Sequence, residues 1–111
     1  MPRFIISFDD GDMTFPMEEL QAVADASHAT VREAQAAGVW IFGGGLGSPD
    51  EATLVRADGT ATDGARNKAY LGGFSIVDVP SRQAALAWAE KFAVSCRCAQ
   101  EVREILPDRE A

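Results

Sequence analysis

The sequence has few cationic side chains and no long apolar run. The chain has 10 lysines and arginines and 17 aspartates and glutamates, which gives a net charge of −7 over 111 residues. Nucleic-acid binding needs clustered cations that neutralise phosphates, so we expect no nucleic-acid partner. No apolar stretch approaches the roughly 20 residues that span a bilayer, and the N-terminus lacks the apolar region of a signal peptide. These absences predict a cytoplasmic protein with no membrane partner.

Cysteine and histidine, the common ligands of structural metals, are also scarce. Cys96, Cys98 and His28 are all that the chain contains. Two cysteines separated by one residue are too close for ordinary disulfide geometry, so both are expected to be free thiols. The set is also too small for a structural zinc site, and no phosphate-binding loop is present. The sequence therefore predicts no metal and no cofactor.

The composition is that of one ordinary folded domain, residues 1–111. Hydrophobic residues make up 47% of the chain and charged residues 24%, which excludes a disordered or low-complexity protein. Short apolar runs predict strands at residues 3–8, 39–45, 70–79 and 100–105. Apolar spacings of three and four predict helices over residues 15–38 and from Ser81 through Phe92. Between them, Asp58-Gly59 predicts a hairpin with a two-residue turn inside residues 52–64.

This order of elements predicts an α+β fold of the ferredoxin-like kind. Strand, helix and strand occur twice, with the hairpin inserted between the two units. Such a split βαβ pattern forms an antiparallel sheet with two helices on one face.

The predicted strands are apolar on both faces, which one layer of helices cannot cover. Successive side chains of a strand point to opposite faces, and Phe4 and Ile6 alternate with Ile5, just as Ile76 alternates with Val77. A second copy packed sheet to sheet is the simplest cover, so the pattern predicts a homodimer. The alternative is a twisted sheet that partly wraps around itself.

Three segments carry a resemblance to a known family. They are TDGARNKAYLGGFSIVDVPSRQAALAWA at residues 62–89, AAGVWIFGGGLGSP at residues 36–49, and the closing QEVREI. Over about residues 3–106 the chain resembles the YCII-related proteins of the DGPF type, which implies the dimeric α+β barrel. The family's Pro-Phe after Asp-Gly is replaced here by Ala65-Arg66, so the chemistry of this loop departs from the family pattern.

His28 is the main catalytic candidate. Its position on the apolar stripe of the first helix is also that of a buried neutral histidine bonded to a backbone carbonyl. The resemblance implies a His–Asp dyad, in which a carboxylate orients the imidazole and leaves its other nitrogen as a general base. Asp9 or Asp10 would supply the carboxylate, and the sequence does not decide between them. Either aspartate could instead simply form the turn before Gly11.

Five further residues are candidate ligand contacts. Arg66 could hold a substrate carboxylate, Gln35 could donate a hydrogen bond, and Gly72 and Gly73 allow a backbone or a ligand to approach a strand closely. Asp63, at the turn before that loop, completes the set. The competing interpretations are a turn residue for Asp63 and solvated surface side chains for Gln35 and Arg66.

Two functions remain open at this point. One is a small enzyme that uses the dyad for proton transfer on an aromatic or carbonyl compound; the resemblance implies dehydrochlorination of a chlorinated hydroxyquinol as the kind of reaction. The other is a non-catalytic dimeric module that binds a small molecule or a regulatory partner. Haem monooxygenation, a third option, has only the single histidine to support it. The sequence does not identify the ligand.

Overall fold

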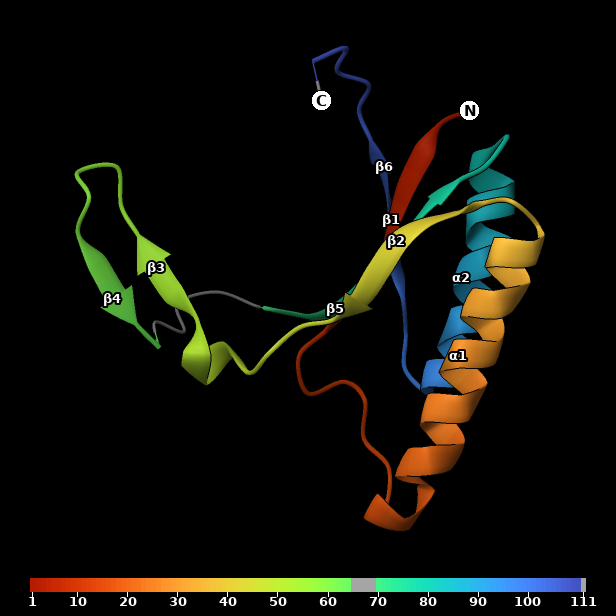
Figure 1. The fold of residues 1–111 in the computed structure, drawn as a ribbon, viewed down its shortest axis with the longest axis horizontal. Helices are drawn as coiled ribbons and strands as arrows, with labels where there is room; N and C mark the ends of the chain where they lie inside the picture. Colours follow the sequence, from red (N-terminus) through yellow and green to blue (C-terminus); the bar gives the residue numbers. More distant parts are fainter. Residues whose placement is uncertain (65–69, 111) are drawn as a thin grey trace.

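A four-stranded antiparallel sheet with two helices on one face forms the body of the molecule (Figure 1). The computed structural model describes residues 1–64 and 70–110. Its sheet contains β1 (Arg3–Asp9), β2 (Trp40–Gly45), β5 (Leu71–Asp78) and β6 (Glu101–Ile105), in the order β2-β5-β1-β6. Helix α1 (Leu20–Ala36) follows β1, and α2 (Arg82–Cys96) follows β5. The predicted split βαβ fold is therefore confirmed.

Three of the four helix ends have a feature that explains their position, and α1 begins from a preceding 3-10 turn without a side-chain cap. A short 3-10 turn, η1 (Met17–Glu19), leads into α1, and Gly38 follows its end with a φ of +74°. Ser81 caps α2 as predicted, because its Oγ accepts a hydrogen bond from the backbone N of Ala84 at 3.1 Å. After α2, Arg97 takes a φ of 58° and donates to Glu19 Oε1 at 2.7 Å. Neither helix, nor any other in the described ranges, is long and apolar enough to cross a membrane.

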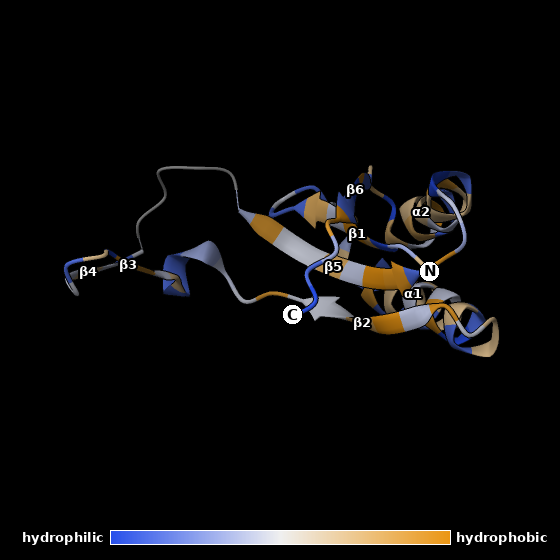
Figure 2. Cartoon of the chain, turned by 90° about the horizontal axis from the view of Figure 1, so that it is seen from above, coloured by the Kyte–Doolittle hydropathy of each residue, from blue (hydrophilic) through white to orange (hydrophobic). Residues whose placement is uncertain are grey.

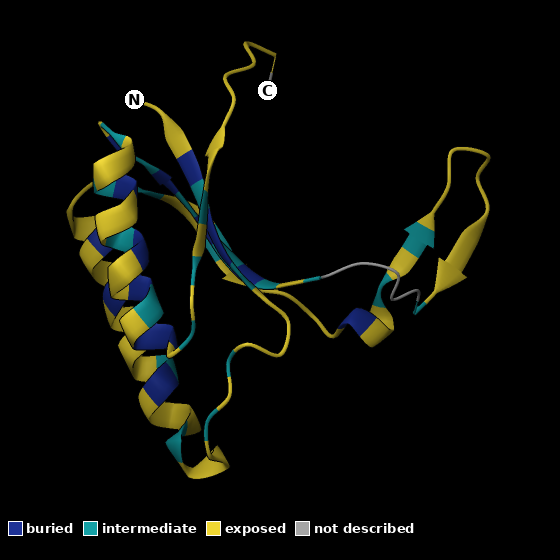
Figure 3. Cartoon of the chain, turned by 180° about the vertical axis from the view of Figure 1, so that it is seen from behind, coloured by how far each residue is buried: buried dark blue, intermediate teal, exposed yellow. Residues whose placement is uncertain are grey.

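The core lies between the sheet and the two helices, and Figure 3 shows the buried residues on these facing sides. Ile6 and Val77 at its centre are almost completely inaccessible. The rings of Trp40 and Phe92, on β2 and α2, lie 6.1 Å apart. The members of the core cluster are Phe4, Ile6, Ala34, Val39, Val77, Val79, Ala85, Ala89 and Phe92.

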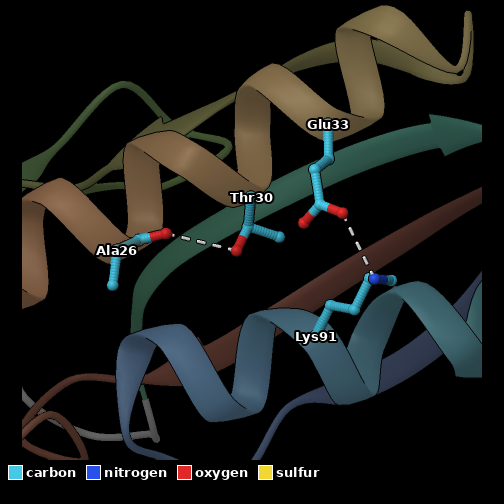
Figure 4. Close-up of polar contacts among 4 residues, drawn as sticks. All are labelled: Ala26, Thr30, Glu33 and Lys91. Carbon is cyan, nitrogen blue, oxygen red and sulfur yellow. Dashed lines mark hydrogen bonds and ion pairs between the residues drawn. The ribbon is translucent and has the colours of Figure 1, made fainter.

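The outer surface of the helix pair is polar where the two helices approach each other. Lys91 of α2 donates to Glu33 of α1 at 3.3 Å, while the buried Thr30 donates to the carbonyl of Ala26 at 3.2 Å within α1 (Figure 4). The ion pair is exposed and contributes little to stability. The outer side of the helices is thus in contact with solvent rather than with another layer.

The other face of the sheet, which we call the open face, is apolar and uncovered. In Figure 2 both helices lie on the same side of the sheet. Phe42 on the open face keeps 62% of its surface exposed, and its ring lies 5.8 Å from that of Phe74. Ile5 and Ile76 are half-buried beside them. This confirms the prediction that the strands carry apolar side chains on both faces.

A hairpin stands away from the sheet, on the side opposite to the helices (Figures 1 and 2). It consists of η2 (Pro49–Glu51), β3 (Thr53–Val55) and β4 (Ala61–Asp63), and its strands form a separate two-stranded sheet. We call residues 46–64 the arm. The predicted hairpin is confirmed, but its turn is wider than two residues: the backbone N of Arg56 donates to the carbonyl of Thr60 at 2.8 Å. Gly59 alone in this turn has positive φ, at +89°.

The arm makes the chain unusually extended for its length. The radius of gyration is 15.6 Å, whereas a compact chain of this size has a value of about 13 Å. The molecule measures 45 × 43 × 18 Å, and the helices and the arm lie at opposite ends of its longest axis (Figure 1).

Candidate functional site

An apolar cavity of about 420 Å³ lies between the sheet and the helices, at the end of the sheet where β1 and β2 finish. Trp40 and Phe92 form part of its inner wall, and Phe8 closes the side toward β5. Met13 and Phe15, in the segment between β1 and η1, line it as well, and we call these two residues its rim. This volume and largely apolar lining suit a small ring compound.

Four polar side chains interrupt the apolar wall. Ser27 and His28 come from α1, Ser75 comes from β5, and Gln100 precedes β6. Ser27 Oγ also lies 3.4 Å from Sγ of Cys96, so a hydrogen bond joins α1 to α2 in the wall of the cavity. A few polar groups in an apolar pocket are what orient a ligand.

His28 is exposed and lines this cavity. The alternative of a histidine sealed in the core is therefore wrong. Among the described residues, the hydrogen bonds and ion pairs do not include this imidazole. Its ring is thus available to a bound molecule, and its pairing with an aspartate stays a prediction.

Asp9 and Asp10 lie at the end of β1, directly after Phe8, and both are exposed. The carbonyl of Asp9 accepts from the backbone N of Asp12 at 3.1 Å, and Gly11 between them has a φ of +88°. The backbone N of Asp10 donates to the carbonyl of Tyr70 at 2.8 Å. Both aspartates therefore form a turn, and the same turn leads into the rim of the cavity.

The group nearest to Gly72 and Gly73 is the ring of Phe8, whereas the sequence predicted the approach of a backbone or a ligand. A Cβ on Gly72 would lie 2.8 Å from Cε2 of Phe8, and one on Gly73 would lie 2.7 Å from Cζ. The two glycines thus determine where one wall of the cavity stands. Direct contact between them and a ligand stays a prediction.

Two of the remaining candidates, Gln35 and Asp63, do not line the cavity. Gln35 is exposed near the end of α1. Asp63 ends β4 on the arm, where its Oδ1 accepts a hydrogen bond from Thr53 Oγ1 at 2.8 Å. Arg66 and the neighbouring Ala65 lie outside the described residues. Roles for these residues in ligand binding stay predictions.

The structure also adds residues that the sequence did not single out. The pKa of the Cys98 thiol is raised to about 11, mainly by burial and to a smaller extent by the nearby Cys96 and Asp12. Gln100 Nε2 donates a hydrogen bond to Cys98 Sγ at 3.5 Å. Asp12 is therefore an acidic group close to the end of α2, where Cys96 and Gln100 line the cavity. Asp12 and Cys98 are far apart in the chain, so no local sequence pattern predicts that they lie close together. No group of three or more His, Cys, Asp or Glu side chains in the described ranges could hold a metal ion.

Comparisons with known proteins agree with this architecture. The family model of the YCII-related domain matches residues 2–107, while no curated protein matches the chain. Among solved structures, the 5-chloro-2-hydroxyhydroquinone dehydrochlorinase of Burkholderia phenoliruptrix, in complex with 2,5-dihydroxybenzoquinone, is similar with a TM-score of 0.52. The two sequences are 20% identical over 99% of this chain and 98% of that chain, which supports a shared fold. Since the family match extends over nearly its whole length, the chain belongs to the YCII-related family.

Proposed function

We propose that this protein is a small enzyme that binds an aromatic or carbonyl compound in the cavity and uses His28 for proton transfer. The observation that carries the proposal is the exposed imidazole of His28 in the wall of an otherwise apolar cavity of about 420 Å³. Histidine exchanges protons readily near neutral pH, and it can act only where a substrate reaches its ring.

The lining of the cavity combines apolar and polar groups in a way that suits a hydroxylated ring. Trp40 and Phe92 offer apolar surface to the ring, while Ser27, Ser75 and Gln100 offer hydrogen bonds to its oxygen substituents. In this proposal His28 takes a hydroxyl proton from the bound ring. Loss of that proton together with chloride, from a chlorinated hydroxyquinol, is one reaction of this class.

An aspartate at the end of β1 would orient His28. Asp9 and Asp10 precede the rim residue Met13 by a few positions in the chain, and a rearrangement on ligand binding that brings either carboxylate to the ring would complete the pair. A carboxylate on one imidazole nitrogen fixes the tautomer and leaves the other nitrogen as the base. The choice between the two aspartates stays open.

We also propose that the active form is a cytoplasmic homodimer. The open face exposes Phe42 and leaves Phe74 and Ile76 half-buried, an apolar surface that a monomer would leave in water. A second copy related by two-fold symmetry presents the same surface in return. Sheets that pack in this way give the dimeric α+β barrel.

The single histidine makes the binding step directly measurable. We would follow the imidazole Cε1 proton by NMR while adding 2,5-dihydroxybenzoquinone, the molecule bound by the similar dehydrochlorinase. A saturable shift of this one resonance is expected. The matched control is Arg32→Ala, one turn along α1 and outside the cavity lining, which should bind normally. No shift at saturating quinone would refute the proposal.

Turnover separates the enzyme from the binding module. Release of chloride from 5-chloro-2-hydroxyhydroquinone, lost in His28→Asn but retained in Arg32→Ala, would establish catalysis. Saturable binding without conversion of this or related chlorinated hydroxyquinols would favour the non-catalytic module.

A further inference from the structure

We propose that the arm of one copy lies across the rim of the partner's cavity, so that each site is built from two chains. This inference rests on the dimer and on the cavity of the proposed function. It assigns a purpose to a segment that contributes little to the fold of its own chain.

Among the described residues, the two strands of the arm pair only with each other. An isolated two-stranded hairpin is marginally stable in water. Val55 on β3 keeps 67% of its surface exposed, and Leu46 at the root of the arm is also exposed. Leu71, where the chain re-enters the sheet, is exposed as well. A partner seated on the open face would therefore contact the arm as well.

The strand directions decide at which end of the dimer the arms lie. The edges of the sheet are β2 and β6, and each neighbouring pair within the sheet is antiparallel. If the two copies close a barrel by pairing β2 with the partner's β6, this pair is antiparallel only when the two-fold axis runs along the strands. That axis keeps corresponding strand ends together. Both cavities and both arms then lie at the same end of the barrel.

The arm is also long enough to reach the partner's cavity. The molecule extends 45 Å along the axis that separates the helices from the arm (Figure 1). A helix layer and a sheet together take about 20 Å, which leaves about 25 Å for the arm. Packed sheets are only about 10 Å apart. The arm therefore passes the partner's sheet and arrives at the level of its helices, where Met13 and Phe15 form the rim.

Cysteine cross-linking between distinguishable chains tests this placement. We would mix ¹⁵N-labelled Val55→Cys chains with unlabelled Met13→Cys chains, allow subunits to exchange, oxidise mildly, and identify the linked peptides by mass spectrometry. Native Cys96 and Cys98 can stay, because their peptides are distinguishable. The expected product is a disulfide between residues 55 and 13 of different chains. The control pairs Val55→Cys with Val94→Cys on the outer surface of α2, and it should not link.

The outcome separates this inference from the proposed function. If sedimentation shows a dimer and residues 55 and 13 do not link, the placement of the arm is refuted, while the proposal for the cavity is unaffected. A monomer in sedimentation also refutes the placement of the arm. If they link but 2,5-dihydroxybenzoquinone never shifts the His28 resonance, the arm is placed correctly and the proposed function fails. Val55→Asp gives a second measurement. In the proposed dimer Val55 is buried against the partner, so its loss should weaken quinone binding about tenfold. Unchanged binding would refute the arm's part in the site.

Discussion

Replacing Phe42 with alanine tests whether the open face of the sheet is the dimer interface. In the single chain this side chain is 62% exposed. Full burial of a phenylalanine contributes about 1.5 to 3 kcal/mol, so covering the exposed part contributes about 1 to 2 kcal/mol in each copy. Two-fold symmetry places two such side chains in the interface. The substitution should therefore weaken the dimer by about 2 to 4 kcal/mol, which is a rise of about 30- to 1,000-fold in its dissociation constant.

Sedimentation equilibrium over a range of concentrations measures this constant for the wild type and the variant. Val94→Ala is the matched control, because Val94 is 75% exposed but lies on the outer surface of α2. The control should leave the dissociation constant unchanged. A wild-type protein that stays monomeric at micromolar concentration would contradict the argument. So would a Phe42→Ala dimer as stable as the wild type, because the open face would then be covered in another way.

Three further predictions concern a single chain. Gly43→Ala should lower the melting temperature, because a Cβ there would overlap the Phe74 carbonyl oxygen of the adjacent strand, whereas Gly44→Ala, with no atom within 4 Å of its Cβ, should cost far less. Ser81→Ala removes the cap of α2 and should destabilise the fold by about 1 kcal/mol in urea unfolding. With a pKa of about 11, the Cys98 thiol is mostly protonated at pH 8, so iodoacetamide should modify it about 100-fold more slowly than a free thiol of pKa 9.0. The rate of modification should rise as the pH approaches 11. Rapid labelling of Cys98 at pH 8 would contradict this prediction.

Much of the fold could be predicted because local signals and the fold agree. Ile5 and Ile6 alternate across β1, Ser81 caps α2, and Gly38 follows the end of α1, so each boundary has a physical cause within a few residues. The turn of the hairpin was less predictable. Asp58-Gly59 allows several turn geometries, and the bonds from Thr60 to the Asp58 carboxylate, which lower the pKa of Asp58, favour the wider one.

The cavity could be predicted only in part, because most of its walls meet through tertiary packing. The apolar stripe of α1 predicts His28 near the side that faces the sheet, and His28 is an exposed residue in the lining of the cavity. In contrast, the contact between Ser27 and Cys96 joins residues 69 positions apart, and no local sequence pattern predicts it. The same holds for Gly73, whose chain position shows that something approaches closely but does not show that it is the ring of Phe8.

The separate two-stranded sheet of the arm has a consequence for how this protein can diversify. Because β3 and β4 are paired with each other rather than with the four-stranded sheet, substitutions on the arm carry little penalty for folding. If each arm borders its neighbour's cavity, such substitutions alter which molecules are admitted. Natural selection could then retune ligand preference by changing a few residues of one appendage, with the core inherited intact.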